Sequence, residues 1–117
     1  MSLILMNGDR RKINRFEIWY VSLDPTVGSE ISKSRPCLVI SQPEMNNNLK
    51  TVLVAPITHK IKNYPSRISF QLQSQDGQIV LDHIRAVDKL RFVKKIGKLD
   101  DVMSYLVYER LKEIFEY

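Results

Sequence analysis

The sequence predicts a mainly β domain, a small and strongly bent sheet or barrel with one amphipathic helix at its C-terminus. Short apolar runs rich in β-branched and aromatic residues fill most of the chain between residues 16 and 97, which is typical of strands. Only residues 100–117 place apolar side chains at helical spacing. At 117 residues the chain has the length of one domain.

The strand predictions rest on run length, alternation and turn residues. CLVIS and TVLVAPIT have the lengths of buried strands, whereas RISFQLQ alternates apolar and polar residues, as a half-exposed strand does. Asp76-Gly77 predicts a hairpin turn. The predicted strands are, in chain order, 16–23, 37–41, 51–58, 67–73, 78–88 and 91–97.

The two ends of the chain differ from this β pattern. Asp100 or Asp101 predicts the N-cap of a helix, because a short acidic side chain accepts hydrogen bonds from free backbone N–H groups. The apolar residues that follow at helical spacing are Met103, Leu106, Val107, Leu111, Ile114 and Phe115. Residues 1–14 hold a basic cluster without periodicity. We expect them to form a flexible basic leader before a single domain at 15–117.

Composition bounds the environment and the partners. Hydrophobic residues make up 44% of the chain and charged residues 26%, as in ordinary globular proteins, and no apolar run approaches a membrane span. The single cysteine, Cys37, fits a reducing compartment, so we expect a cytoplasmic protein. The net charge is +5, although residues 100–117 are acidic overall. The basic remainder predicts a polyanionic partner, nucleic acid above all, or simply a solvated basic surface.

Metal and cofactor chemistry have little support in the sequence. The nitrogen and sulfur ligands are His59, His83 and Cys37, and none is paired at the spacing that metal sites use. Asp82 and His83 are neighbours, and neighbours on a strand point to opposite faces. There is also no glycine-rich phosphate loop. We therefore predict neither a metal nor a cofactor.

Arg35 stands where the polar loop GSEISKS becomes an apolar run. The residue before proline is held in extended backbone, and Pro36 suits the first position of a strand. The guanidinium would then project from a firm base, with a fork of donors that matches phosphate oxygens. The alternative is a surface arginine paired with Glu30 or Asp82.

Thr58 lies at the other end of a buried run, where TVLVAPIT enters the basic loop HKIKN. Its hydroxyl can donate to a phosphate or cap a turn. His59 follows it and is either a proton-transfer group or an ordinary loop histidine. Lys60 and Lys62 make the loop basic, which is also common on solvated faces. Asp82 interrupts an apolar run and needs a partner, for which Arg85, Arg35 or a ligand are the candidates.

Five segments in this order resemble the MazF/PemK/Kid family of toxins from toxin–antitoxin systems: EIWYVSLDPTVGSE, SRPCLVIS, VLVAPIT, IRAVDK and KKIGKL. The resemblance implies an SH3-like barrel of the CcdB/MazF/Kid type with a C-terminal helix. It implies a homodimeric, metal-independent endoribonuclease that cuts single-stranded RNA at short sequences. It also implies an antitoxin partner whose acidic C-terminal segment covers the RNA site.

By its matching motifs, the resemblance implies that Arg35 stabilises the phosphorane and that Thr58 positions a non-bridging oxygen. Glu30 corresponds to a loop carboxylate that assists proton transfer or gates the site, and Asp82 to an acid–base aspartate. We hypothesise that His59, which replaces the usual serine, supplies part of the proton chemistry. The RNA-binding residues are expected to be Ser29, Lys33, Ser34, Lys60, Lys62 and Arg85.

The sequence departs from the family pattern in ways that leave alternatives open. Phe16 stands where the family often has glycine, Ile31 where it often has glutamine, and the loop histidine and arginine of Kid-like members are Ser29 and Val80 here. A CcdB-like toxin would share the barrel but bind gyrase instead of cutting RNA. A homologue that binds antitoxin or RNA without activity is the third possibility.

Overall fold

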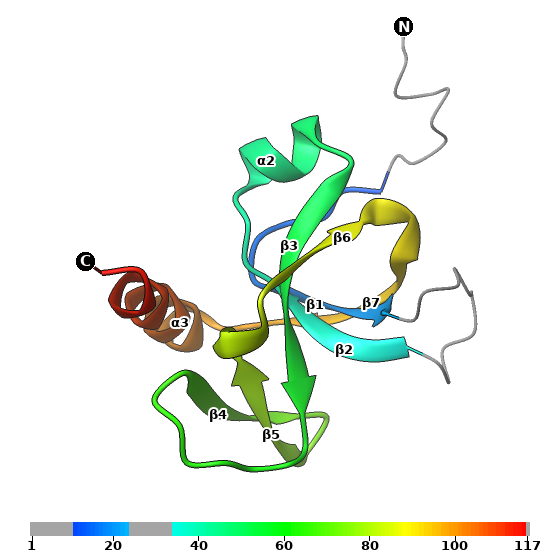
Figure 1. The fold of residues 1–117 in the computed structure, drawn as a ribbon. Coiled ribbons are helices and arrows are strands. Elements are labelled where there is room, and N and C mark those ends of the chain that lie inside the picture. The colour runs from blue at the N-terminus through cyan, green and yellow to red at the C-terminus, as the bar shows by residue number, and fades with distance from the viewer. Residues whose placement is uncertain (1–10, 24–33, 117) are drawn as a thin grey trace, which may run out of the picture.

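One curled antiparallel sheet forms the body of the computed structural model, which describes residues 11–23 and 34–116 (Figure 1). Its strands are β1 (Glu17–Ser22), β2 (Ser34–Val39), β3 (Thr51–Thr58), β4 (Arg67–Leu72), β5 (Gln75–Val80), β6 (Arg85–Asp88) and β7 (Phe92–Lys98). The helices are α2 (Pro43–Asn48) and α3 (Asp101–Ile114), with short 3-10 turns η2 (Leu81–His83) and η3 (Lys89–Arg91). The predicted mainly β fold with a C-terminal helix is confirmed.

Strand β3 organises the sheet, whose order is β4-β5-β3-β2-β1-β7 with β6 also paired to β3. The first half of β3 pairs with β6, from Thr51 to Val54, and its last two residues, Ile57 and Thr58, pair with β5. Because β3 changes partner along its length, the β4–β5 hairpin turns away from the rest of the sheet (Figure 1). The result is a half-barrel with a separate hairpin that extends from it.

Alternation along the strands produces two apolar cores, one on each side of the main sheet. The barrel interior holds Ile13, Trp19, Val21, Cys37, Val39, Val52, Val54, Val87 and Phe92. The opposite side packs against the hairpin and α3 and holds Ile18, Leu38, Ile40, Ala55, Ile57, Ile68, Leu72, Ile79, Leu81, Leu99 and Val107. Asp100 caps α3, since its carboxylate accepts from the Met103 N–H at 2.8 Å.

The β4–β5 hairpin exists, but the predicted position of its turn is wrong. Leu72 pairs with Gln75, so the two-residue turn is Gln73-Ser74, with φ values of 52° and 67°. Two positive φ angles match the twist of a tight hairpin, whichever residues supply them. Gly77 lies within β5, where an added Cβ would approach the Thr58 carbonyl oxygen to 3.2 Å. Glycine at this position thus relieves crowding between β5 and β3, and it does not form the turn.

Two further elements differ from the prediction. The segment 42–50, for which the sequence predicted neither a strand nor a helix, contains the helix α2, and the predicted strand 78–88 is divided into β5 and β6 by η2. Residues 11–14 of the expected flexible leader pack on the domain: Ile13 is 2% exposed, and Arg11 donates to the carbonyls of Phe92 and Lys89. Residues 1–10 lie outside the described residues. In the described ranges, no helix has both the length and the apolar character needed to cross a membrane.

Candidate functional site

Arg35 is exposed near the start of β2 and is held there by two constraints. It pairs with Val21 of β1, and Pro36 after it restricts its backbone to the extended region. Side chains alternate along a strand, so Arg35 projects from the same side of the sheet as Cys37. Within the ranges 11–23 and 34–116, its guanidinium has no hydrogen-bond or ion-pair partner. Its fork of N–H donors is therefore not used by any other described residue.

Thr58 is brought towards Arg35 by the register between β2 and β3. The last pair of this ladder is Cys37 with Pro56, and beyond it the two strands diverge (Figure 1). Arg35 and Thr58 each lie two residues past that pair, on the two diverging strands. By alternation both side chains point to the same side of the sheet as Cys37 and Pro56. The two residues are 23 positions apart in the sequence, so only the register shows that they share this side of the sheet.

A second guanidinium joins this site from β6. Arg85 pairs with Val54 of β3, is exposed and, like Arg35, has no side-chain partner among the described residues. Burial raises the pKa of the Cys37 thiol to about 12, against the opposing positive charges of Arg85 and Arg35. Both arginines therefore lie near the same buried thiol. Two guanidiniums on one side of a sheet, both without a partner among the described residues, favour an anionic ligand such as a phosphate.

The residues after Thr58 form an ordered turn. The Thr58 hydroxyl oxygen accepts from the Lys60 N–H at 3.1 Å, which leaves its own O–H free to donate. His59 Nδ1 lies 2.9 Å from the Asp76 carbonyl oxygen. A carbonyl can only accept, so Nδ1 carries the proton and Nε2 is the basic nitrogen of the neutral ring. The turn therefore leaves the Thr58 O–H as a donor and His59 Nε2 as a nitrogen that can accept a proton.

Gln78 is a polar residue of this region that the sequence analysis missed. It is 4% exposed, pairs with Thr58 across β3 and β5, and forms hydrogen bonds in both directions with the backbone of Lys62. A glutamine within a strand carries no local signal of such a role. The sequence gives one hint, since Gln78 stands directly before the apolar run Ile79-Val80-Leu81 of the predicted strand.

Asp82 is not brought to Arg35 or Arg85. Its carboxylate accepts from the Ser66 hydroxyl at 2.9 Å and from Arg67 Nε at 3.2 Å. Burial alone would raise the pKa of Asp82, but the hydrogen bonds from Ser66 and Arg67 outweigh it and lower this pKa. The ion pair with Arg67 fits a structural role at the start of β4.

The remaining predicted residues divide into described and undescribed ones. Lys60 and Lys62 are exposed on the loop after Thr58, and Ser34 pairs with Ser22 at the first position of β2. Ser29, Glu30 and Lys33 lie outside the described residues. Among the residues that the structure describes, no cluster of histidine, cysteine or carboxylate side chains has the geometry of a metal site.

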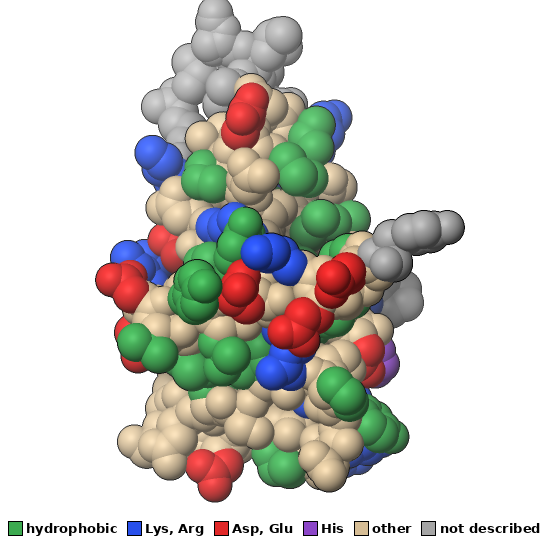
Figure 2. Space-filling model, turned by 90° about the vertical axis from the view of Figure 1, so that its left-hand side faces the viewer, with side chains coloured by type: hydrophobic (Ala, Val, Ile, Leu, Met, Phe, Trp, Pro, Cys, Tyr) green, Lys and Arg blue, Asp and Glu red, His purple; other side chains and the backbone are tan. Residues whose placement is uncertain are grey.

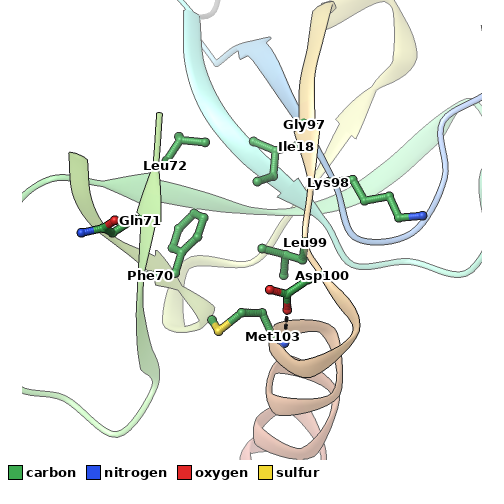
Figure 3. A pocket seen from close by; sticks show the side chains of 9 residues that line it. All are labelled: Ile18, Phe70, Gln71, Leu72, Gly97, Lys98, Leu99, Asp100 and Met103. Carbon is green, nitrogen blue, oxygen red and sulfur yellow. Dashed lines mark hydrogen bonds between the residues drawn. The ribbon is translucent and has the colours of Figure 1, made fainter. Parts of the chain in front are cut away.

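A hollow in the described part of the chain lies away from these residues. It has a volume of about 330 Å³ and lies where β1, β4, β7 and the start of α3 meet (Figure 3). Its lining is Ile18, Phe70, Gln71, Leu72, Gly97, Lys98, Leu99, Asp100 and Met103. Several of these residues belong to the core between the sheet and α3, on the side of the sheet opposite to Cys37. This hollow is therefore separate from the two arginines.

Comparison with known proteins assigns the chain to a family. The sequence matches the family described as PemK-like, MazF-like toxin of type II toxin–antitoxin system over residues 14–115. The chain belongs to this family. The endoribonuclease EndoA of Bacillus subtilis (strain 168) is 35% identical over 106 residues, which cover 86% of this chain and 91% of EndoA.

Solved structures of toxins share the fold at lower sequence identity. MazF from Deinococcus radiodurans superposes with a TM-score of 0.74 at 20% identity, covering 92% of this chain and 99% of that one. Mycobacterium tuberculosis toxin MazF-mt6 gives a TM-score of 0.70 at 20% identity, covering 86% and 96%. A MazE–MazF structure from D. radiodurans gives 0.73 at 17% identity, covering 91% and 97%.

Proposed function

We propose that this protein is the toxin of a type II toxin–antitoxin pair and acts as a metal-independent endoribonuclease on single-stranded RNA. The observation that carries the proposal is that Arg35, Arg85 and Thr58 lie on one side of the sheet, with no side-chain partner for either guanidinium among the described residues. The relation to EndoA of B. subtilis, an endoribonuclease, supports the same reaction class. In this reaction the RNA supplies its own nucleophile, so the protein needs only to bind phosphate and move protons.

The chemistry follows from the groups that the site presents. The 2′ oxygen bonds to the adjacent phosphorus, the bond from phosphorus to the 5′ oxygen breaks, and the products are a 2′,3′-cyclic phosphate and a 5′-OH. Arg35 would stabilise the charge of the phosphorane and Thr58 would donate to a non-bridging oxygen. One proton leaves the 2′-OH and one reaches the 5′ oxygen. His59 Nε2 and Glu30 are the proposed proton acceptors, and Arg35 is the proposed donor.

The direct test is cleavage of a long RNA by the purified protein in EDTA, with mapping of the new 5′ ends. We expect clustered cuts at a short sequence and ends that polynucleotide kinase phosphorylates without prior phosphatase treatment. Intact RNA would overturn the proposal. Cleavage that requires an added divalent ion would overturn the metal-independent mechanism.

Variants separate charge from geometry at Arg35. We expect Arg35→Ala to abolish detectable cleavage and Arg35→Lys to recover little, because lysine keeps the charge but loses the donor fork. Lys94→Ala, which removes one exposed positive charge from β7, is the matched control and should cleave normally. Equal losses in Arg35→Ala and Lys94→Ala would mean that net charge alone explains the effect.

Two partners complete the proposal. Structures of related toxins include complexes with antitoxins, and a basic surface beside Arg35 suits the acidic C-terminal segment of such a partner. A homodimer would bury exposed apolar residues on the outer side of α3: Val102, Tyr105 and Leu106 are 78%, 65% and 39% exposed. The face on the side of α3 shows apolar side chains interspersed with charges (Figure 2). We expect a cytoplasmic location, as for an enzyme that acts on cellular mRNA.

A further inference from the structure

A row of polar side chains crosses the strands next to the proposed active site. Thr58 of β3 pairs with Gln78 of β5, and Gln78 pairs in turn with Ser69 of β4. Paired residues of antiparallel strands point to the same side of a sheet, so these three side chains form one continuous row. The row begins at the proposed catalytic threonine and leads away from it across the hairpin.

Gln78, in the middle of the row, is buried and hydrogen-bonded. Its Oε1 accepts from the Lys62 N–H at 3.0 Å, and its Nε2 donates to the Lys62 carbonyl at 2.9 Å and to the Ser69 hydroxyl at 3.3 Å. The carboxamide thus pairs with Lys62 as a peptide group of a neighbouring strand would. A buried carboxamide that is this well satisfied acts as a specific clamp, since the loss of either bond leaves a buried polar group unpaired.

The clamp acts on the basic loop that follows Thr58. His59 holds the beginning of this loop at the Asp76 carbonyl, and Thr58 accepts from the Lys60 N–H. Gln78 holds its middle, at Lys62. These bonds order the backbone of the loop, whereas the side chains of Lys60 and Lys62 are exposed and the Lys62 ammonium lies 5.9 Å from the centre of the Tyr64 ring.

We propose that Gln78 is a positioning residue for RNA binding. Through Lys62 it holds the loop at 59–64 beside Thr58, so that Lys60 and Lys62 contact phosphates next to the scissile one. The inference rests on the proposed ribonuclease function and adds to it the residue that sets the path of the RNA backbone. Phosphate contacts of this kind fix the register of a nucleic acid and act on binding, so Gln78 should affect KM and not kcat.

The test compares Gln78→Leu, which fills the site without hydrogen bonds, with Gln71→Leu as the matched control. Gln71 lies on the same hairpin, is exposed and bonds only to Asp76 within that hairpin. Hydrogen exchange of the free proteins reports whether the loop is released. Steady-state cleavage of a short fluorescent RNA that contains the mapped cut site reports KM and kcat at several salt concentrations.

We expect Gln78→Leu to exchange the amides of 60–64 at least about tenfold faster and to raise KM about fivefold, with kcat within about twofold of the unaltered protein. The salt dependence of kcat/KM should become shallower, by about 0.7 in slope for each phosphate of single-stranded RNA that the protein ceases to neutralise. Gln78→Glu keeps the acceptor for the Lys62 N–H, so its KM and its amide exchange should lie between those of Gln78→Leu and of the unaltered protein. Gln71→Leu should match the unaltered protein.

A double-mutant cycle adds a readout that a purely structural role would not move. If Gln78 acts through Lys62, then Lys62→Ala in the Gln78→Leu background should raise KM little further, so the two effects should not add. Additive effects would overturn the inference, as would an unchanged KM in Gln78→Leu or a loss confined to kcat. Absence of cleavage by the unaltered protein would instead overturn the proposed function, and this inference with it.

Discussion

At Arg35, the proline that follows and one strand pairing together fix the backbone from which the guanidinium projects. Pro36 excludes helical backbone angles at Arg35, and the pairing with Val21 holds the backbone of Arg35 against β1. A guanidinium on such a base loses little conformational entropy when it binds, in contrast to one on a mobile loop. Asp82, one of the two partners that the sequence suggested, is bound by Arg67 and Ser66 instead.

His59 provides the first test at the scale of a single residue. Its Nδ1 is held by the Asp76 carbonyl, so Nε2 is the free acceptor next to Thr58 in the chain. If Nε2 accepts the proton from the 2′-OH, His59→Ala should lower kcat by about a hundredfold. The fall of activity towards acid pH should also change, because protonated imidazole cannot act as a base.

The control for His59 is the other histidine, His83, which is exposed on η2. His83→Ala should keep both the rate and its pH profile. Full cleavage with an unchanged pH profile in His59→Ala would show that the proton acceptor is another group.

Phe16 provides a second residue-scale test, since its φ of 67° lies in the left-handed region that favours glycine. Its N–H donates to the Val39 carbonyl at 2.7 Å and its carbonyl accepts from Leu99 N–H at 3.0 Å, so the surrounding structure holds this backbone. This geometry explains why glycine at this position suits the fold. Phenylalanine adds contacts with the core and with the Arg15 guanidinium, 4.7 Å from the ring centre.

We expect Phe16→Gly to be more stable than Phe16→Ala by about 1 kcal/mol, because both lose the ring but only alanine keeps the strain. Urea unfolding of the two variants measures this difference. At an ordinary extended position the order would be reversed. A more stable alanine variant would therefore contradict the left-handed backbone at this residue.

At the scale of elements, Glu17 joins β1 to the segment before it and to β7. The carboxylate is buried and accepts from Asn14 N–H at 2.9 Å, from Trp19 Nε1 at 3.1 Å and from Lys95 Nζ at 2.9 Å. Burial alone would raise the pKa of Glu17, but the hydrogen bonds from Asn14, Lys95 and Trp19 outweigh it and lower this pKa. The folded protein therefore favours the ionised form.

A lowered pKa in the folded state stabilises the fold above the unfolded pKa, and this stabilisation is lost as the pH falls through the folded value. Glu17→Gln should thus lower the free energy of unfolding at neutral pH by about 1–3 kcal/mol. It should also weaken the acid dependence of stability below about pH 5. Urea titrations across this range test both effects, with the exposed Glu113→Gln as control. An unchanged acid dependence would assign it to other carboxyls, such as Asp82.

The β4–β5 hairpin and α2 show why some elements could not be predicted. Asp76-Gly77 is a strong local turn signal, but Gly77 serves the close approach of β5 to Thr58, and the turn falls at Gln73-Ser74. In α2, Asn46 is buried and bonds to Ser41 and to the Ile13 carbonyl, residues outside the helix. Both features depend on contacts between distant segments, which propensity does not report.

At the scale of the whole molecule, the outer face of α3 is the proposed dimer surface. Tyr105 is 65% exposed at its centre, between Val102 and Leu106. If a second copy covers this face, Tyr105→Glu should weaken dimerisation by at least about tenfold. Sedimentation velocity over a range of concentrations measures this change.

The control is Leu49→Glu, which places the same charge on an exposed apolar residue next to α2. It should leave the dimer intact. A monomeric unaltered protein, or a dimer that survives Tyr105→Glu, would remove α3 as the interface. Cleavage by a monomer would further show that one copy holds a complete site.

The sequence by itself determined most of the strands, the C-terminal helix with its cap at Asp100 or Asp101, the Arg35-Pro36 step and the basic charge, since each depends on neighbouring residues or on composition. The tertiary structure alone decided which of the candidate residues lie on the same side of the sheet. Register places Arg35, Thr58 and Arg85 on one side of the sheet and removes Asp82 from them. Register also places Gln78 next to Thr58, because β5 pairs with the end of β3. Strand register arises from burial over the whole sheet, so no local pattern contains it.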